Sequence, residues 1–124
     1  MINNNGVTFL HQAYYDNNIE VVKILINHPR FEYNMLTNLR NTPFLYACSH
    51  KSYKVVKYMI NDSKTQVNHF NCNYETPLHK DCSCQSLKIR KILINDPRVD
   101  INIMDKNKNT PFSSSLFTWK LWCY

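Results

Sequence analysis

The sequence contains a single glycine, and this scarcity excludes a whole class of sites. One glycine against five prolines leaves no room for a glycine-rich phosphate-binding loop in 124 residues. No apolar stretch approaches the roughly 18 residues that a membrane-spanning helix needs. Met1 is followed by Ile-Asn-Asn-Asn-Gly rather than by the basic and then apolar run of a secretory signal. The sequence therefore predicts no nucleotide-binding loop, no membrane span and no secretion signal.

Acidic residues are also few. Nine Asp and Glu stand against 15 Lys and Arg, which gives a net charge of +6. This excess suits an acidic partner or nucleic acid, depending on where the charges lie. The five cysteines are an odd number in a chain without a signal peptide, so a reducing compartment is expected, the cytoplasm or else the nucleus. With 44% hydrophobic and 19% charged residues, the composition is that of one globular domain over residues 1–124.

Several columns of residues recur every 34 positions. The threonines of one column are Thr8, Thr42, Thr76 and Thr110. The same spacing joins aliphatic residues in three further columns: Val21, Val55 and Ile89; Leu25, Met59 and Leu93; Ile26, Ile60 and Ile94. A fixed period of this length indicates stacked structural repeats. The repeats cover about residues 3–36, 37–70 and 71–104, and a partial fourth covers 105–124.

Each repeat is predicted to form two short antiparallel helices. Threonine is a good helix N-cap, and proline is tolerated directly after it because its missing amide hydrogen would have no partner there. First helices are expected at residues 9–15, 43–49, 77–83 and 111–117, and second helices at 19–26, 53–60 and 87–94. Isolated helices shorter than about 12 residues are marginal in water. Each helix must therefore bury its apolar face on its partner and on the neighbouring repeat.

The run Thr76-Pro77-Leu78-His79 and the run Ile19–Ile26 resemble the signature of the ankyrin repeat family. The resemblance covers nearly the whole chain. It implies an all-α solenoid of helix-turn-helix units with short β-hairpin-like loops, here three full repeats plus the partial fourth. It also implies that His79 caps and bridges hairpin backbone. A tetratricopeptide array shares the 34-residue period, but its Trp and Leu-Gly signature is absent.

Two departures from the family pattern bear on stability. The glycine that the family places between its two helices is replaced by Asn17, Lys51 and Gln85. If the backbone there is left-handed, Asn tolerates it best, while Lys and Gln would cost about 1 kcal/mol or somewhat more. Asp81 stands where Ala13 and Ala47 stand. We favour a locally displaced third repeat at Asp81 over the alternative, a buried acid with a perturbed pKa.

Histidine and cysteine spacing raises the possibility of zinc. His69-x-x-Cys72 and His79-x-x-Cys82 have the spacing of two half-sites. The repeat frame offers a simpler account, in which His79 belongs to the threonine motif and Cys82 is the counterpart of the apolar Cys48. No nucleophile signature surrounds any cysteine. We therefore expect no metal, no cofactor and no enzymatic activity.

Lysine and arginine columns also follow the period. They are Lys23, Lys57 and Lys91; Arg30, Lys64 and Arg98; and Lys54 and Lys88. Stacked, they would form a cationic stripe able to hold acidic protein, nucleic acid or anionic lipid. We expect no aromatic residues between them in base-stacking fashion. We favour a solvent-exposed convex face, which makes nucleic acid a less favoured partner.

The resemblance implies binding of a partner protein through hairpin tips and the concave face of the first helices. Carried over by position, the partner-binding residues are Tyr15, Asp16, Asn38, Leu39, Asn41, Ser49, His50, Asn73, Glu75, Ser83, Lys106 and Asn107. The expected function is a scaffold or adaptor. The alternatives are a fragment of a larger ankyrin protein whose effector region lies elsewhere, or a basic binder of nucleic acid or anionic membrane. The apolar end of the chain, from Phe112 to Tyr124, is explained by a segment that folds back as a cap, by an adhesive patch, or by a chain that is a fragment of a longer array. We favour the fragment.

Overall fold

The computed structural model describes residues 4–29, 32, 34–84 and 87–111, without the side chains of residues 82–84. Its elements are six helices: α1 (Phe9–Tyr15), α2 (Ile19–Ile26), α3 (Pro43–Ser49), α4 (Tyr53–Met59), α5 (Pro77–Cys84) and α6 (Leu87–Ile94). Helix ends agree with the sequence-based expectation to within one residue. Of the predicted helix at 111–117, only Pro111 is described. Arg30, Gln85 and the apolar segment from Phe112 to Tyr124 lie outside the described residues.

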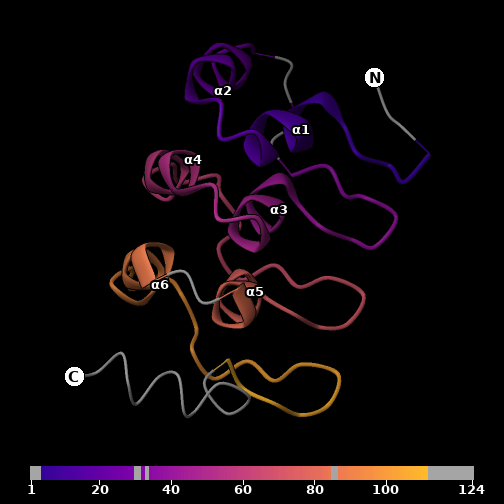
Figure 1. The fold of residues 1–124 in the computed structure, drawn as a ribbon, viewed down its shortest axis with the longest axis vertical. Coiled ribbons are helices and arrows are strands. Elements are labelled where there is room, and N and C mark those ends of the chain that lie inside the picture. Colours follow the sequence, from indigo (N-terminus) through magenta and orange to yellow (C-terminus); the bar gives the residue numbers. More distant parts are fainter. Residues whose placement is uncertain (1–3, 30–31, 33, 85–86, 112–124) are drawn as a thin grey trace.

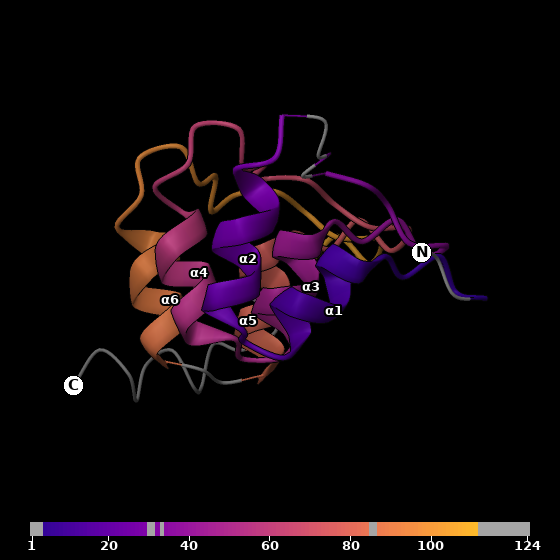
Figure 2. The ribbon, with the colours of Figure 1, turned by 90° about the horizontal axis from the view of Figure 1, so that it is seen from above.

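The helices form two layers (Figure 1). One layer stacks α1, α3 and α5, the other stacks α2, α4 and α6, and each helix also packs on its partner in the pair. Viewed from above, the long loops project away from both layers (Figure 2). Within the described residues the structure is all-α, because these loops contain turns but no strand.

The core lies between the two layers. The apolar columns of the sequence supply it, and its members include Leu10, Val22, Phe44, Val55, Val56, Leu78, Ile89 and Leu93. Neither helix of a pair could bury this surface alone, since each has only seven or eight residues. The stack therefore holds together through contacts between neighbouring pairs.

Threonine and histidine fix the start of the first helices. In α1 the Thr8 hydroxyl accepts from the backbone N–H of His11, and Nδ1 of His11 accepts in return from the Thr8 N–H, which makes a capping box. His11 Nε2 then donates to the carbonyl of Asn41 in the next hairpin-like loop, 2.9 Å away. His79 repeats this arrangement with Thr76 and with the carbonyl of Asn109. The expected role of His79 is confirmed.

The hairpin-like loops are joined to one another by backbone hydrogen bonds. The N–H of Asn38 donates to Asn5, that of Cys72 to Leu39, and that of Lys106 to Asn73, all over 2.8–3.0 Å. Each tip contains one residue with positive φ: Gly6, Arg40, Tyr74 and Lys108. The single glycine occupies the first of these positions, where a Cβ would approach the Asn38 side chain to 2.8 Å.

The turns between α1 and α2 and between α3 and α4 are left-handed, as the glycine replacements suggested. Asn17 has φ 56° and Lys51 has φ 59°. The Asn17 side chain also accepts from the Val55 N–H in the first turn of α4. Ser52 makes no side-chain cap there and instead donates to the Tyr15 carbonyl. A residue of the first pair thus caps a helix of the second.

Asp81 does not displace the third helix pair, so that expectation is wrong. Helix α5 begins 34 residues after α3 and packs on it as α3 packs on α1. Asp81 is fully buried, and its carboxylate lies 3.4 Å from Nε of the equally buried Arg90 on α6. Arg90 stands in the column of Val22 and Val56. Two apolar core positions have therefore been replaced by one pair of opposite charges.

Candidate functional site

The layer of first helices carries a cluster of aromatic rings from α1 and α3. Tyr15 lies 4.4 Å from His50 and 5.8 Å from Tyr46, measured between ring centroids, and Tyr46 lies 4.8 Å from His50. Tyr15 ends α1 and His50 is the C-cap of α3, so stacking of the two helices brings the rings together. Tyr15 and His50 are exposed and Tyr46 is half-buried. We call Tyr15, Tyr46 and His50 the aromatic cluster.

A groove beside the first two hairpin-like loops continues this cluster. Its volume is about 300 Å³, and its lining consists of Asn5, Val7, Thr37, Asn38, Leu39, Asn41 and Tyr46. Leu39 is 62% exposed, although it is a large apolar side chain. Tyr46 belongs both to this groove and to the aromatic cluster. The loop tip and the inner helix face are thereby one continuous surface.

A more polar depression lies further along the stack. It has a volume of about 270 Å³ and is lined by Asn73, Glu75, Asp105, Lys106 and Asn107. Glu75 pairs with Lys80 of α5 at 3.6 Å. Burial, and then the charge of Lys80, lowers the pKa of His50, so the charge of Lys80 is felt at the aromatic cluster. The surface thus changes from aromatic to charged along the stack.

The predicted partner-binding residues differ in how the fold uses their side chains. Some use their side chains inside the fold: the Asn38 amide donates to the Asn4 carbonyl, the Asn41 side chain accepts from Asn71, and Ser49 donates to the Tyr46 carbonyl. Asp16 accepts from Gln12 on its own helix. Asn38 and Asn41 also line the groove together with Leu39, while Tyr15 and His50 belong to the aromatic cluster. The polar depression is lined by Asn73, Glu75, Lys106 and Asn107. Ser83 lies in α5, but its side chain is outside the described part.

Tyr46 is the member of the aromatic cluster that sequence analysis missed. It lies one turn before His50 on α3, and its column holds Gln12 and Lys80. Because no residue type recurs in this column, the repeat comparison gives no signal. Helical spacing could have found it, since positions four apart on a helix share one face.

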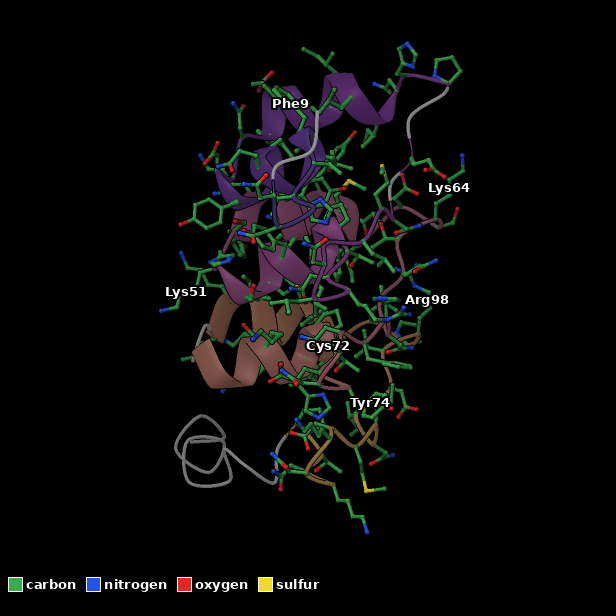
Figure 3. The ribbon with its side chains drawn as sticks, turned by 90° about the vertical axis from the view of Figure 1, so that its right-hand side faces the viewer. Phe9, Lys51, Lys64, Cys72, Tyr74 and Arg98 are labelled. Carbon is green, nitrogen blue, oxygen red and sulfur yellow. The ribbon has the colours of Figure 1, made fainter. Side chains whose placement is uncertain are left out.

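The histidines of the proposed zinc half-sites are engaged by the backbone. His69 Nε2 lies 3.0 Å from the carbonyl of Arg40, and His79 bonds Thr76 and Asn109 as described above. Among the described residues, no group of three or more His, Cys, Asp or Glu is placed to hold a metal ion. Cys72 lies at an exposed loop tip, as Figure 3 shows beside Tyr74.

The buried acid at Asp81 is enclosed and not a reaction centre. Burial raises its pKa from 3.8 to about 7, and the positive charge of Arg90 offsets part of that rise. The perturbed-acid alternative is therefore the one the structure supports. Because Asp81 has no exposed surface, a substrate has no access to it.

The outer layer carries lysines together with tyrosine rings. Nζ of Lys23 lies 5.4 Å from the centroid of Tyr58, and those of Lys57 and Lys88 lie 5.8 and 5.3 Å from Tyr53. The lysines come from α2, α4 and α6, and both rings come from α4. Aromatic side chains do lie among the basic columns.

Comparison with known proteins agrees with this architecture. A family model described as ankyrin repeats, three copies, matches residues 1–71. The chain belongs to the ankyrin repeat family, whose members are generally protein–protein interaction modules. The matched segment ends before α5, and the structure continues the same helix pairing through α5 and α6.

A search of curated proteins finds no match to this chain. Among the described residues, no helix is long and apolar enough to cross a bilayer.

Proposed function

We propose that this chain is a non-catalytic scaffold or adaptor that holds a partner protein against its hairpin tips and the concave face of α1, α3 and α5. The observation that carries the proposal is the continuity of that surface through Tyr46, which lines the Leu39 groove and contacts Tyr15 and His50. Tyrosines in a partly desolvated patch next to a polar rim are typical of the centre of protein interfaces. Cytoplasm or nucleus is the compartment that goes with this proposal.

Site-specific photo-crosslinking tests this surface. A photoreactive phenylalanine analogue replaces Leu39 in one protein and Ile24 in another. Both positions are exposed and apolar, but Ile24 lies on α2 in the outer layer. After irradiation in a native-cell lysate, we expect a discrete cross-linked protein from position 39 and none from position 24.

Charge variants give the second readout. Leu39→Glu with His50→Glu places two carboxylates in the groove and the aromatic cluster, and we expect it to abolish recovery of the cross-linked protein in an ordinary pull-down. Ile24→Glu is the matched control and should leave recovery unchanged. Equal recovery with all three proteins would remove the concave face as the binding site.

A further inference from the structure

The outer layer presents a recess lined by lysine and tyrosine. It lies between α2 and α4, has a volume of about 420 Å³, and is lined by Ile19, Lys23, Tyr53, Lys54, Lys57, Tyr58 and Asn61. Together with Lys88 and Lys91 of α6, we call these residues the lysine–tyrosine face. It belongs to the layer opposite the aromatic cluster (Figure 2).

The positive charge of this face is not balanced locally. Helices α4 and α6 contain Lys54, Lys57, Lys88 and Lys91 but, apart from the buried Arg90, no other charged residue. Arg90 points into the core towards Asp81. Among the described residues, no ion pair includes a lysine of this face. Glu20 on α2 is the one carboxylate within these three helices.

Tyrosine rings hold the lysines in place across helix boundaries. Lys23 of α2 lies over Tyr58 of α4, and Lys88 of α6 lies over Tyr53 of α4. Each such contact contributes about 0.5–1 kcal/mol at an exposed site. The ammonium groups are therefore partly ordered before any ligand arrives, which lowers the entropic cost of binding an anion.

We propose that the lysine–tyrosine face binds an acidic segment of a protein, in extended polyproline-type conformation, with a carboxylate at every third residue. Neighbouring helices pack about 8–10 Å apart, so the Lys23, Lys57 and Lys91 column repeats at about that distance. A polyproline II chain has three residues per turn and rises about 3.1 Å per residue. Its residues i, i+3 and i+6 therefore face one way, about 9 Å apart, and match the column.

The geometry distinguishes this occupant from other anions. Single-stranded nucleic acid binds through bases stacked on open aromatic faces, whereas two ammonium groups already lie within 6 Å of the Tyr53 centroid. A planar lipid surface would meet the projecting lysines but would not fill a recess between two helices. A narrow peptide that crosses α2, α4 and α6 can follow the lysine column and place an apolar residue in the recess, against Ile19 and the tyrosine rings.

Fluorescence anisotropy with two synthetic peptides tests the proposal. One peptide has Glu at every third position with Pro and Ala between, and the other has the same composition with its Glu residues adjacent at one end. We expect the spaced peptide to bind roughly tenfold more tightly at low salt, because it can reach several lysines at once. Equal affinity for the two peptides would overturn the proposed register.

Matched protein variants locate the site. Lys57→Glu with Lys88→Glu should weaken binding of the spaced peptide at least about tenfold. Lys64→Glu with Lys106→Glu makes the same charge change on the loops (Lys64 is labelled in Figure 3) and should weaken it less than about twofold. Tyr58→Leu keeps an apolar side chain but removes the ring under Lys23, and should weaken binding about two- to fivefold. Circular dichroism melts confirm that each variant is folded.

Two competitors complete the test. An oligothymidylate strand and vesicles containing phosphatidylserine are added to the preformed peptide complex at equal charge concentration. We expect the peptide to remain bound. Displacement of the peptide by either competitor would show that the face binds anions without the proposed selectivity, and would overturn the proposal. An equal loss of peptide affinity in Lys64→Glu with Lys106→Glu would overturn it as well. The concave-face variants Leu39→Glu and His50→Glu should bind the spaced peptide with an affinity within about threefold of the wild type. A failure of this proposal can therefore be distinguished from a failure of the proposed function.

Discussion

At Asp81 and Arg90, two charged residues occupy core positions that are apolar in the other helix pairs, and the helix packing is unchanged. A buried carboxylate alone is costly, and so is a buried guanidinium. Here each is placed within 3.4 Å of the other by two helices of one pair. The pair is a local exception to an otherwise apolar seam, in a chain whose other two helix pairs have Ala and Val at the same places.

Restoring the apolar columns should therefore be tolerated when both residues change together. We expect Asp81→Ala or Arg90→Val alone to cost about 3–5 kcal/mol of unfolding free energy, because each leaves an uncompensated buried charge. The double variant should be neutral or more stable by about 1–4 kcal/mol. Urea denaturation of the four proteins measures the coupling. Additive single effects would contradict the interpretation of the pair as one unit.

The raised pKa of Asp81 predicts a particular pH dependence. Its pKa is about 7 in the folded state and 3.8 in the unfolded state, so between these values the folded protein binds more protons. Stability then falls as pH rises from about 4 to 7. The double variant Asp81→Ala with Arg90→Val lacks this group. We expect the stability difference between double variant and wild type to grow over that interval, measured by urea denaturation at half-unit steps, and a constant difference would contradict it.

At the scale of helices and loops, the turns within helix pairs differ in whether they cap the second helix of the next pair. Asn17 accepts from the Val55 N–H, whereas Lys51 adopts the same left-handed backbone with a side chain that cannot accept a hydrogen bond. The N–H of Ile89 in α6 is the counterpart of that of Val55.

Lys51→Asn should consequently stabilise the protein. We expect a gain of about 1–2 kcal/mol, partly from relief of the left-handed backbone and partly from a new cap on α6. Lys51→Gly relieves the backbone without adding an acceptor, so it should gain only about 0.5–1 kcal/mol. Thermal melts of the three proteins separate the two contributions. A larger gain from Gly than from Asn would rule out the cap.

His11 makes the capping box of α1 sensitive to acid. Burial lowers its pKa below the usual 6.5, with hydrogen bonds to backbone acting in the opposite direction. In the neutral form Nε2 donates to Asn41 and Nδ1 accepts from Thr8, and protonation of Nδ1 would remove that acceptor. Because the unfolded state takes up the proton first, stability is lost as pH falls below about 6.5.

His11→Leu tests this, since Leu45 occupies the equivalent position in α3. We expect the variant to be less stable than wild type by about 1–2 kcal/mol at pH 7.5, and this gap to narrow at pH 5. Denaturation in urea at the two pH values provides the measurement.

The helices and the loop tips could be predicted from the sequence because their signals are local. Thr-Pro pairs and aliphatic runs at a fixed period determine where the helices begin and which face they bury. Leu39, Tyr15 and His50 are carried over by position from the ankyrin resemblance, and their role in binding stays a prediction. Tyr46 and the Asp81–Arg90 pair could not be predicted in this way, because their importance depends on which side chains meet across two helices. The hydrogen bonds of the Asn38 and Asn41 side chains with Asn4 and Asn71 likewise depend on which loops meet in the fold.

At the scale of the whole molecule, the two-layer stack separates two surfaces. The aromatic cluster and the hairpin tips belong to the inner layer and its loops, while the lysine–tyrosine face belongs to the outer layer (Figures 1 and 2). A partner on one side leaves the other accessible. A solenoid of this kind can therefore connect two proteins without any conformational change.

The same architecture predicts that salt stabilises the free protein. Stacking places the lysines of successive outer helices about 8–10 Å apart, within the Debye length of about 10 Å at 0.1 M salt, in a chain of net charge +6. Repulsion along the column opposes stacking, and NaCl screens it. We expect the melting temperature to rise by about 3–5 °C between 0.05 and 0.5 M NaCl.

Lys57→Gln with Lys91→Gln removes two charges from one column and should halve that rise. Lys64→Gln with Lys106→Gln removes two charges outside the column and should change the rise little. If the melting temperatures of both double variants rise with salt as much as that of the wild type, the lysines of the column do not repel one another measurably. In that case the tyrosine rings hold the lysines near one another without destabilising the stack.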